Sequence, residues 1–218
     1  MKPGDLAGAI LKETRCLGFA LDPAVASRMQ QHFELLQRWS RAVDLTSIRE
    51  PARAVPFYVE PVLVLDLFGS AQGATLLDLG SGGGFPGLIL AMLRPCWRVL
   101  LVERGARKAA FLAEAARQLG LPKVEVLELN LGSAADLPGG IDPDRLTLKA
   151  VGGGFHLALD LLERRGAGSA RAVIFTGTRG ALDLARMVER RSHRLKLDER
   201  RKLPGRRSSY AVVVQRVV

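Results

Sequence analysis

A glycine-rich turn between an apolar run and a second apolar segment constrains this chain more than any other feature. Residues 76–88 read Leu-Leu-Asp-Leu-Gly-Ser-Gly-Gly-Gly-Phe-Pro-Gly-Leu, which predicts a buried strand carrying Asp78, a turn, and a helix with Pro86 in its first turn. Glycine accepts backbone angles that other residues resist, and a backbone without side chains can approach a ligand closely. We therefore expect a polar ligand at this strand-to-helix turn.

The positions of the acidic residues indicate which ligand the turn binds. A dinucleotide-binding loop reads G-x-G-x-x-G and presents a helix N-terminus to a pyrophosphate, whereas this chain has Gly80-x-Gly82-x-Gly84 preceded by Asp78. A carboxylate there would repel a pyrophosphate but suits the ammonium and sulfonium groups of S-adenosylmethionine. The next apolar run ends at Glu103, where an acid can accept hydrogen bonds from ribose hydroxyls of either cofactor. Asp78 therefore favours S-adenosylmethionine; the alternative is a tight turn that only packs a helix on a sheet.

The composition is that of a single soluble domain of enzyme size. With 218 residues and 48% hydrophobic content, the chain can bury a sizeable core. It has no apolar run near the roughly 20 residues of a membrane span, and its N-terminus does not resemble a signal peptide. We expect a cytoplasmic monomer. The two cysteines lie far apart and the three histidines are scattered, which predicts no metal site and core positions for Cys16 and Cys96.

Positive charge is concentrated towards the C-terminus. The formal net charge is +10, and residues 164–207 contain 14 Lys or Arg but only four acidic residues. Such a region attracts a polyanion, with an affinity that falls as salt rises. A GC-rich genome is the alternative explanation, because 25 of the 32 basic residues are Arg. The clustering favours RNA binding, with Arg206 and Arg207 as candidate phosphate contacts.

Alternating strand and helix patterns from residue 71 onward predict a doubly wound α/β core, preceded by an N-terminal helical extension over residues 1–70. Asp22 and Pro23 begin a helix with apolar residues at three- and four-residue spacing, and a further helix follows a loop around Pro51. We expect residues 71–218 to form a mostly parallel sheet with helices on both faces and an antiparallel edge at the basic turn 202–207. The predicted core strands are 75–79, 98–102, 124–129, 146–149, 172–176 and 210–217, and the predicted helices are 59–68, 87–93, 108–119, 155–164 and 181–191.

The glycine turn is similar to the signature of the bacterial small-subunit ribosomal RNA guanine-N7 methyltransferases, the RsmG or glucose-inhibited division protein B family. Its distinctive part is Gly-Phe-Pro-Gly at 84–87. Two other segments resemble the family: a tryptophan followed by Asp-Leu-Thr-Ser-Ile-Arg within 39–49, and Arg-Lys-Ala-Ala-Phe-Leu at 107–112. The resemblance covers residues 20–215, is strongest over 75–121, and implies a Rossmann-like methyltransferase sheet.

This resemblance implies methyl transfer from S-adenosylmethionine to N7 of a guanine in 16S ribosomal RNA or the small ribosomal subunit, with no membrane or DNA partner. Guanine N7 has a lone pair and no proton, so in-line attack needs no general base; positioning alone is worth about 7 to 11 kcal/mol. The target base has to be unstacked. The residues expected to contact the cofactor are Asp78 at the methionine ammonium, Gly80, Ser81, Gly82 and Gly84 in the turn, Phe85 closing over the cofactor, Glu103 at the ribose, Leu131 and Gly132 along the adenine, and Lys149 at the mouth where cofactor and RNA meet.

Several positions depart from the family pattern near the expected site. At position 149, a lysine in place of the family's arginine keeps the positive charge but not the bidentate hydrogen-bonding geometry of a guanidinium. The departures leave three hypotheses: an active RNA methyltransferase, a descendant that binds RNA or cofactor without catalysis, and an NAD-dependent oxidoreductase, which the acid before the turn disfavours. The departures are Phe57 for a histidine, Glu60-Pro61 for an acidic residue and serine, Asn130-Leu131-Gly132 for Arg-Ala-Glu, Lys149-Ala150 for Arg-Ala, and Thr176-Gly177 for Lys-Gly.

Overall fold

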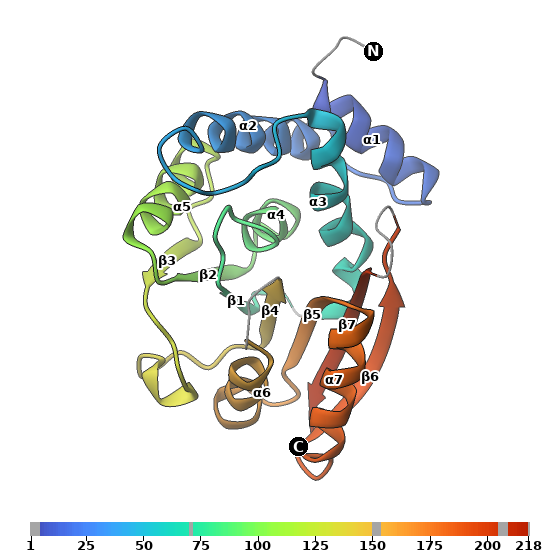
Figure 1. Ribbon diagram of the computed structural model, residues 1–218, viewed down its shortest axis with the longest axis vertical. Coiled ribbons are helices and arrows are strands. Elements are labelled where there is room, and N and C mark those ends of the chain that lie inside the picture. The colour runs from blue at the N-terminus through green and yellow to red at the C-terminus, as the bar shows by residue number, and fades with distance from the viewer. Residues whose placement is uncertain (1–4, 70–71, 150–153, 205–208, 218) are drawn as a thin grey trace.

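A seven-stranded sheet forms the centre of the structure, a computed structural model that describes residues 5–69, 72–149, 154–204 and 209–217 (Figure 1). The strand order is β3-β2-β1-β4-β5-β7-β6, in which β1 to β5 are parallel and β7 runs antiparallel to both β5 and β6. The strands are β1 (Thr75–Leu79), β2 (Arg98–Glu103), β3 (Val124–Glu128), β4 (Arg145–Lys149), β5 (Arg171–Gly177), β6 (Leu195–Lys202) and β7 (Ser209–Arg216).

The strand order reverses direction between β1 and β4, which places a crevice at their carboxyl ends. The chain moves outward from β1 through β2 to β3 and then returns to pair β4 with β1. Ligands of open α/β sheets bind at such a switch point, outside the carboxyl ends of the strands. Residues that follow β1, β2 and β4 are therefore brought together, although they are far apart in the sequence.

Helices cover both faces of the sheet, as Figure 1 shows. α4 and α5 pack on one face with α2 and α3 outside them, and α6 and α7 pack on the other. Among the described residues, none of the helices combines the length and apolar character needed to cross a bilayer. The helices are α1 (Leu6–Cys16), α2 (Pro23–Trp39), α3 (Pro51–Leu63), α4 (Gly87–Leu93), α5 (Ala106–Gln118), α6 (Gly154–Arg165) and α7 (Thr178–Glu189), with short 3-10 turns η1 (Leu65–Phe68) and η2 (Ala134–Asp136).

The central strands are apolar because both of their faces are covered. In β1 the four residues from Leu76 to Leu79 are all buried, and in β2 all five from Val99 to Glu103 are buried. Strands that are buried on both faces have nearly continuous apolar runs rather than alternating patterns. The predicted doubly wound, mostly parallel sheet is confirmed, including its antiparallel edge.

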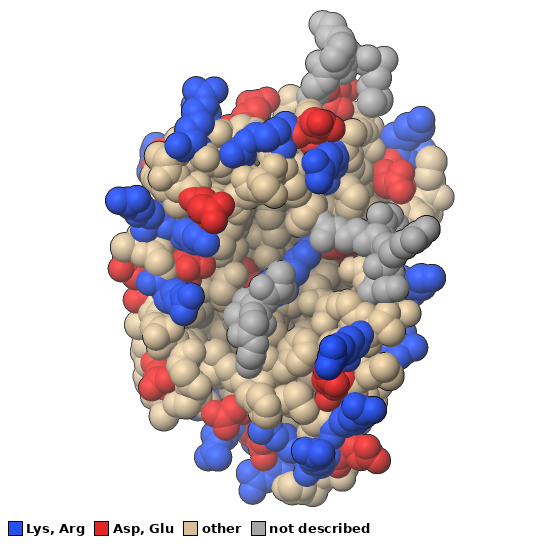
Figure 2. Space-filling model, viewed as in Figure 1, with Lys and Arg blue, Asp and Glu red and all other residues tan. Residues whose placement is uncertain are grey.

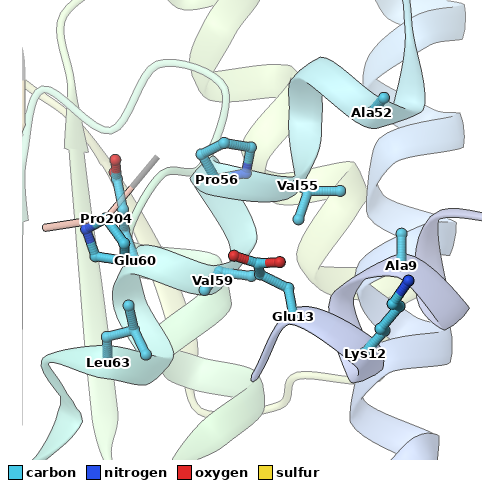
Figure 3. A pocket seen from close by; sticks show the side chains of 10 residues that line it. All are labelled: Ala9, Lys12, Glu13, Ala52, Val55, Pro56, Val59, Glu60, Leu63 and Pro204. Carbon is cyan, nitrogen blue, oxygen red and sulfur yellow. The ribbon is translucent and has the colours of Figure 1, made fainter. Parts of the chain in front are cut away.

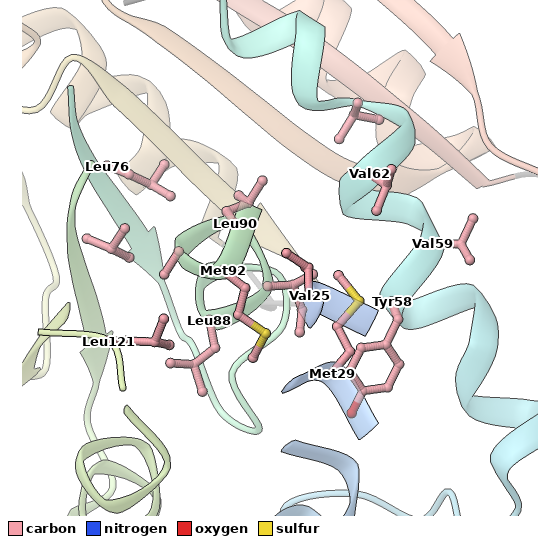
Figure 4. Packing of buried hydrophobic residues seen from close by; sticks show 14 of the residues in the cluster. Val25, Met29, Tyr58, Val59, Val62, Leu76, Leu88, Leu90, Met92 and Leu121 are labelled. Carbon is pink, nitrogen blue, oxygen red and sulfur yellow. The ribbon is translucent and has the colours of Figure 1, made fainter. Parts of the chain in front are cut away.

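The N-terminal helices share one hydrophobic core with the sheet. As predicted, the Asp22 carboxylate caps α2 by accepting the Ala24 amide (2.8 Å), and Pro23 occupies its first position. The apolar face of α2, including Val25 and Met29, packs against α3 and α4 around Leu88 (Figure 4). The core cluster continues from α1 to the inner face of β7, so the helical extension and the sheet bury apolar surface against each other.

The predicted loop around Pro51 was wrong, whereas the predicted helical segment over 59–68 is confirmed as the last turns of α3 and the 3-10 turn η1. α3 begins at Pro51 and ends at Leu63, and η1 follows it. Proline is accepted in the first helical turn, where an amide donor has no partner within the helix. The helix over Leu6–Cys16 was not predicted; Asp5 caps it by accepting the Gly8 amide (2.8 Å).

The expectation that both cysteines lie in the core was also wrong. Cys16 and Cys96 are exposed. Cys16 is the last residue of α1, and Cys96 lies in the turn between α4 and β2. A helix end and a turn lie at the surface of the fold, so the position in the fold rather than the apolar character of the thiol determines the exposure of these cysteines.

Candidate active site

The glycine turn between β1 and α4 lies against the end of β2. The amides of Gly80 and Ser81 both donate to the Val102 carbonyl, at 2.9 and 3.0 Å. Gly84 has φ of 86°, and a β-carbon there would collide with the Leu88 side chain. Glycine at 84 is therefore required both by the backbone conformation and by close packing.

Asp78 is buried at the carboxyl end of β1, and its carboxylate has no hydrogen-bond partner among the described residues. Its exposed fraction is 1%. The Ser81 hydroxyl donates to the main-chain carbonyl of Asp78 instead (3.1 Å). Burial raises the pKa of Asp78 to about 7, and the nearby Ser81 hydroxyl, Gly87 amide and Lys149 ammonium oppose this only in part. A buried polar group without a partner is costly and rare, and it points to a ligand.

Gly87 gives this carboxylate its space at the start of α4. A β-carbon at Gly87 would collide with Asp78 Oδ2 and with the Leu101 side chain. The second glycine of Gly-Phe-Pro-Gly, Gly87, is thus required by close packing against Asp78. The sequence pattern alone did not reveal this reason.

Glu103 joins the end of β2 to the glycine turn. Its Oε2 accepts the Gly82 amide (3.0 Å) and its Oε1 accepts the Gly105 amide (2.9 Å). An ionised carboxylate has about four acceptor positions, so Glu103 keeps the capacity to accept further hydrogen bonds. It borders a cavity of about 630 Å³, a size typical of small-molecule sites.

Four of the predicted cofactor residues line this cavity together: Gly80, Glu103, Leu131 and Gly132. The Gly132 amide, however, already donates to Asp136 Oδ2 (2.9 Å), which also accepts the Ser133 amide (2.9 Å). Gly132 therefore offers the cavity its backbone surface rather than its amide. The cavity is also lined by Asn130, a position at which the chain departs from the family pattern, and by Leu79, Val102, Arg104, Lys108, Leu129, Leu148, Gly154, His156 and Leu157.

Lys149 lies at the end of β4 in contact with α3 and β5. Its Nζ is 2.5 Å from Glu60 Oε2, and the exposed fractions of the two side chains are 11% and 1%. The same ammonium lies 4.9 Å from the centre of the Phe57 ring and 5.2 Å from that of Phe175. Phe57 and Lys149, at which the chain departs from the family pattern, thus lie together with Glu60.

Phe85 packs among aromatic side chains instead of lining the large cavity. Its ring centre is 5.0 Å from that of Tyr58, 5.2 Å from that of His32 and 5.5 Å from that of Phe57. The glycine turn is therefore held against α2 and α3 by the ring that follows it.

His32 of α2 contributes a hydrogen bond to the turn, and sequence reasoning missed it. Nε2 lies 3.0 Å from the Gly83 carbonyl, so this nitrogen carries the proton and donates, while Nδ1 accepts the Tyr58 hydroxyl at 2.9 Å. Burial lowers the pKa of His32 to about 4, so the ring is neutral near pH 7. The signal was present: His32 lies three residues after Met29 and four before Leu36, on the buried face of the helix.

The face of the molecule seen in Figure 2 is hollowed near its centre, with Lys and Arg side chains spread around it. The candidate phosphate contacts Arg206 and Arg207 lie outside the described residues, as does Ala150. Exposed basic residues that are described include Arg179 and Arg186 on α7. Within the described part of the chain, no group of three or more His, Cys, Asp or Glu side chains is placed to hold a metal ion.

A family model described as rRNA small subunit methyltransferase G matches residues 25–164, which include Asp78, Glu103 and Lys149. The chain belongs to the rRNA small subunit methyltransferase G family. The predicted family resemblance is therefore confirmed, and the match extends from α2 to the end of α6.

Curated relatives named ribosomal RNA small subunit methyltransferase G support this membership. One from Nitrosospira multiformis is 41% identical over 112 residues, which are 51% of this chain and 50% of that protein. One from Stenotrophomonas maltophilia is 36% identical over 149 residues, 68% of this chain and 67% of that protein. The chain spans about half the length of the first of these rRNA small subunit methyltransferase G relatives and two thirds of the second.

Solved structures share the fold of this member of the rRNA small subunit methyltransferase G family. A protein described as a SAM-dependent methyltransferase from Aquifex aeolicus superposes with a TM-score of 0.61 at 18% identity, covering 84% of this chain and 98% of that one. At such low identity the similarity concerns the fold alone, which is that of Rossmann-like methyltransferases.

Proposed function

We propose that this protein transfers the methyl group of S-adenosylmethionine to N7 of a guanine in 16S ribosomal RNA, in line and without a general base. Membership of the rRNA small subunit methyltransferase G family supports the reaction class. The single observation that carries the choice of cofactor is the Asp78 carboxylate, which is buried and without a hydrogen-bond partner among the described residues, beside the glycine turn.

The residues present fit this cofactor. Asp78 offers an unpartnered acceptor for the methionine ammonium, and Glu103 offers its remaining acceptor positions to the ribose hydroxyls. Leu131 and Leu157 supply apolar surface for the adenine within the 630 Å³ cavity. When bound, S-adenosylmethionine supplies an electrophilic methyl group on a sulfonium. A pyrophosphate would instead meet the Asp78 carboxylate, which argues against a dinucleotide.

No residue has to remove a proton in this reaction. The N7 lone pair forms the new carbon–nitrogen bond while the carbon–sulfur bond breaks, its electron pair stays on sulfur, and the positive charge moves to the base. The protein therefore acts by orienting the two reactants and excluding water. The Phe85 ring and the His32–Gly83 hydrogen bond hold the glycine turn in position.

Ribosomal RNA is the proposed partner, either free or in the small subunit, and the proposed location is the cytoplasm where that RNA lies. The net charge of +10 supports a polyanionic substrate. Arg206 and Arg207 stay predicted phosphate contacts, since they lie outside the described residues.

Methyl transfer is tested with labelled S-adenosylmethionine and 16S ribosomal RNA or small subunits from a strain that lacks the family enzyme. We expect label in RNA, and 7-methylguanosine after nuclease digestion and mass spectrometry. An Asp78→Asn variant, which should bind S-adenosylmethionine more weakly, serves as the control at a cofactor concentration near the dissociation constant of the wild type. Cofactor and RNA binding without any transfer would contradict the proposal and favour the non-catalytic descendant.

A further inference from the structure

Four side chains from three elements converge beside the glycine turn. Phe57 and Glu60 lie one helical turn apart on α3, Phe175 lies on β5, and Lys149 ends β4. The Lys149 ammonium touches the Glu60 carboxylate and lies over both phenyl rings. A carboxylate together with aromatic faces is a combination that binds organic cations as well as ammonium groups.

We infer that Phe57, Glu60 and Phe175 form the binding site for the target guanine, and that the Lys149 ammonium occupies this site in the free protein. The inference rests on the proposed methyl transfer to guanine N7. It assigns a substrate role to Glu60 and to Phe57, at which the chain departs from its family pattern.

The location of the site suits a base that receives the methyl group. The Phe57 ring lies 5.5 Å from that of Phe85, the aromatic residue of the glycine turn. Lys149 is close enough to Asp78 to lower the pKa of that carboxyl. Phe57 of the proposed guanine site is thus adjacent to the end of the cofactor site where Asp78 would hold the methionine ammonium.

The chemistry of guanine matches the three side chains. Guanine presents an N1–H and an N2 amino group on its Watson–Crick edge, and a carboxylate has two oxygens that accept both hydrogen bonds. Unstacked bases bind commonly by stacking on aromatic rings. Adenine has an acceptor at N1, which would face the Glu60 carboxylate, so the same site disfavours adenine.

Methylation changes the charge of the base in the direction that this site favours. The product, N7-methylguanine, carries the positive charge that left the sulfonium. It would take the place of the Lys149 ammonium between the same carboxylate and rings. Glu60 also borders a cavity of about 360 Å³ between α1 and α3 (Figure 3), so open volume lies beside the carboxylate.

An exchange of Lys149 for the base keeps the buried charges paired. Removing one partner of a buried ion pair is strongly unfavourable when nothing replaces it. The guanine edge replaces the ammonium at Glu60, and the displaced Lys149 meets an anion, either the cofactor carboxylate or an RNA phosphate. The site is therefore expected to fill only when a guanine nucleotide and the cofactor are both present.

Binding of guanosine 5′-monophosphate and its N7-methyl derivative tests the inference. Both are titrated into the protein with saturating S-adenosylhomocysteine, at a mildly acidic pH at which the methylated base keeps its N1 proton. We expect the methylated nucleotide to bind about 10-fold more tightly, as a cation between a carboxylate and aromatic faces should. Equal affinities for the two nucleotides would overturn the inference.

Variants then locate the preference. In Glu60→Gln the ratio of the two affinities should fall towards one. Glu13 lines the same 360 Å³ cavity as Glu60, but the ion pair of Lys149 is with Glu60, so Glu13→Gln should keep the preference for the methylated nucleotide. If Glu60→Gln does not fold, the double variant Glu60→Gln with Lys149→Met removes both charges and should also lose the preference. A preference that survives the loss of Glu60 contradicts the inference.

The outcomes separate this inference from the proposed function. A protein that binds S-adenosylmethionine and methylates ribosomal RNA, but does not discriminate the two nucleotides, refutes the guanine site alone. A protein that neither binds S-adenosylmethionine nor methylates RNA refutes the proposed function, whatever its nucleotide preference.

Discussion

Asp78 occupies a position that costs folding free energy. Burial raises its pKa to about 7, above the ordinary value near 4. The folded state therefore favours the protonated carboxyl. The contribution of Asp78 to stability is full below the unfolded pKa and is lost as the pH rises through about 7. A carboxylate kept at this cost is expected at a binding site rather than in a structural core.

Replacing Asp78 by Asn removes this titration. We expect the unfolding free energy of Asp78→Asn, relative to wild type, to rise by about 2 to 4 kcal/mol between pH 4.5 and pH 8, because one pKa unit corresponds to about 1.4 kcal/mol. Urea unfolding of both proteins at each pH measures this difference in unfolding free energy. Titrations that the two proteins share cancel in the difference. A difference that is independent of pH would show that Asp78 is not desolvated.

The sequence was sufficient to place Asp78, Glu103 and the glycines, because their spacing follows from one strand–turn–helix unit. It was not sufficient for the contact between Lys149 and Glu60, which are 89 residues apart. Spacing in the sequence carries no information about such a pair, since the return of the chain to β4 brings it together.

At the scale of elements, α2 supports the glycine turn through one histidine. His32 links the Gly83 carbonyl to the Tyr58 hydroxyl of α3, so three segments meet at a single ring. Because burial lowers the pKa of His32 to about 4, its contribution to stability is present above about pH 6.5 and is lost as the pH falls through 4.

His32→Phe tests this connection. The change leaves the Gly83 carbonyl and the Tyr58 hydroxyl without their partner, and we expect it to destabilise the protein by about 1 to 3 kcal/mol. It should also remove part of the destabilisation between pH 6.5 and 4, and weaken S-adenosylmethionine binding. Tyr58→Phe, which leaves the Gly83 contact intact, is the matched control for binding. Unaltered affinity in His32→Phe would mean that the turn holds its conformation without α2.

The edge strand β6 is joined to the end of α3 by Arg201. Its guanidinium donates to both Asp66 carboxylate oxygens (2.7 and 2.8 Å) and to the Leu63 carbonyl (2.8 Å). Arg201→Lys loses the bidentate geometry. Because both side chains are partly exposed, we expect a cost of only about 1 kcal/mol in urea unfolding. Arg186→Lys, in an exposed pair on α7, should cost less; equal costs would contradict a special role for Arg201.

Element types were predicted better than element boundaries. The central strands of the sheet were recognisable because buried parallel strands are apolar throughout. The edge strand β6 was not predicted, because it is mostly charged and exposed. The start of α3 was missed because Pro51 reads as a loop residue in the sequence, although it is equally compatible with the first turn of a helix. Only the packing of α3 against α1 and α4 decides between the two.

At the scale of the whole molecule, the helical part and the sheet share one core. A single cluster of buried side chains extends from Leu6 in α1 to Val213 in β7. We therefore propose that residues 1–70 and 71–218 act as one compact unit. The composition predicted a core of this size, but not that α1 would contribute to it.

The net charge of +10 predicts salt-sensitive RNA binding. If the protein contacts about five phosphates, its affinity for 16S ribosomal RNA should fall about 100-fold between 50 and 200 mM salt. Filter binding over a salt series gives the slope of the logarithm of affinity against the logarithm of salt concentration. A slope near zero would show that the basic residues only solubilise the protein.

We propose that Asp78 and Glu103 make this fold a site for S-adenosylmethionine. Isothermal titration of the purified protein with S-adenosylmethionine, with NAD in parallel, tests it most directly. We expect micromolar binding of S-adenosylmethionine alone, weakened about 10- to 100-fold in Asp78→Asn through the loss of charge-assisted hydrogen bonds. Binding of NAD instead, or S-adenosylmethionine affinity that is unchanged in Asp78→Asn, would contradict it.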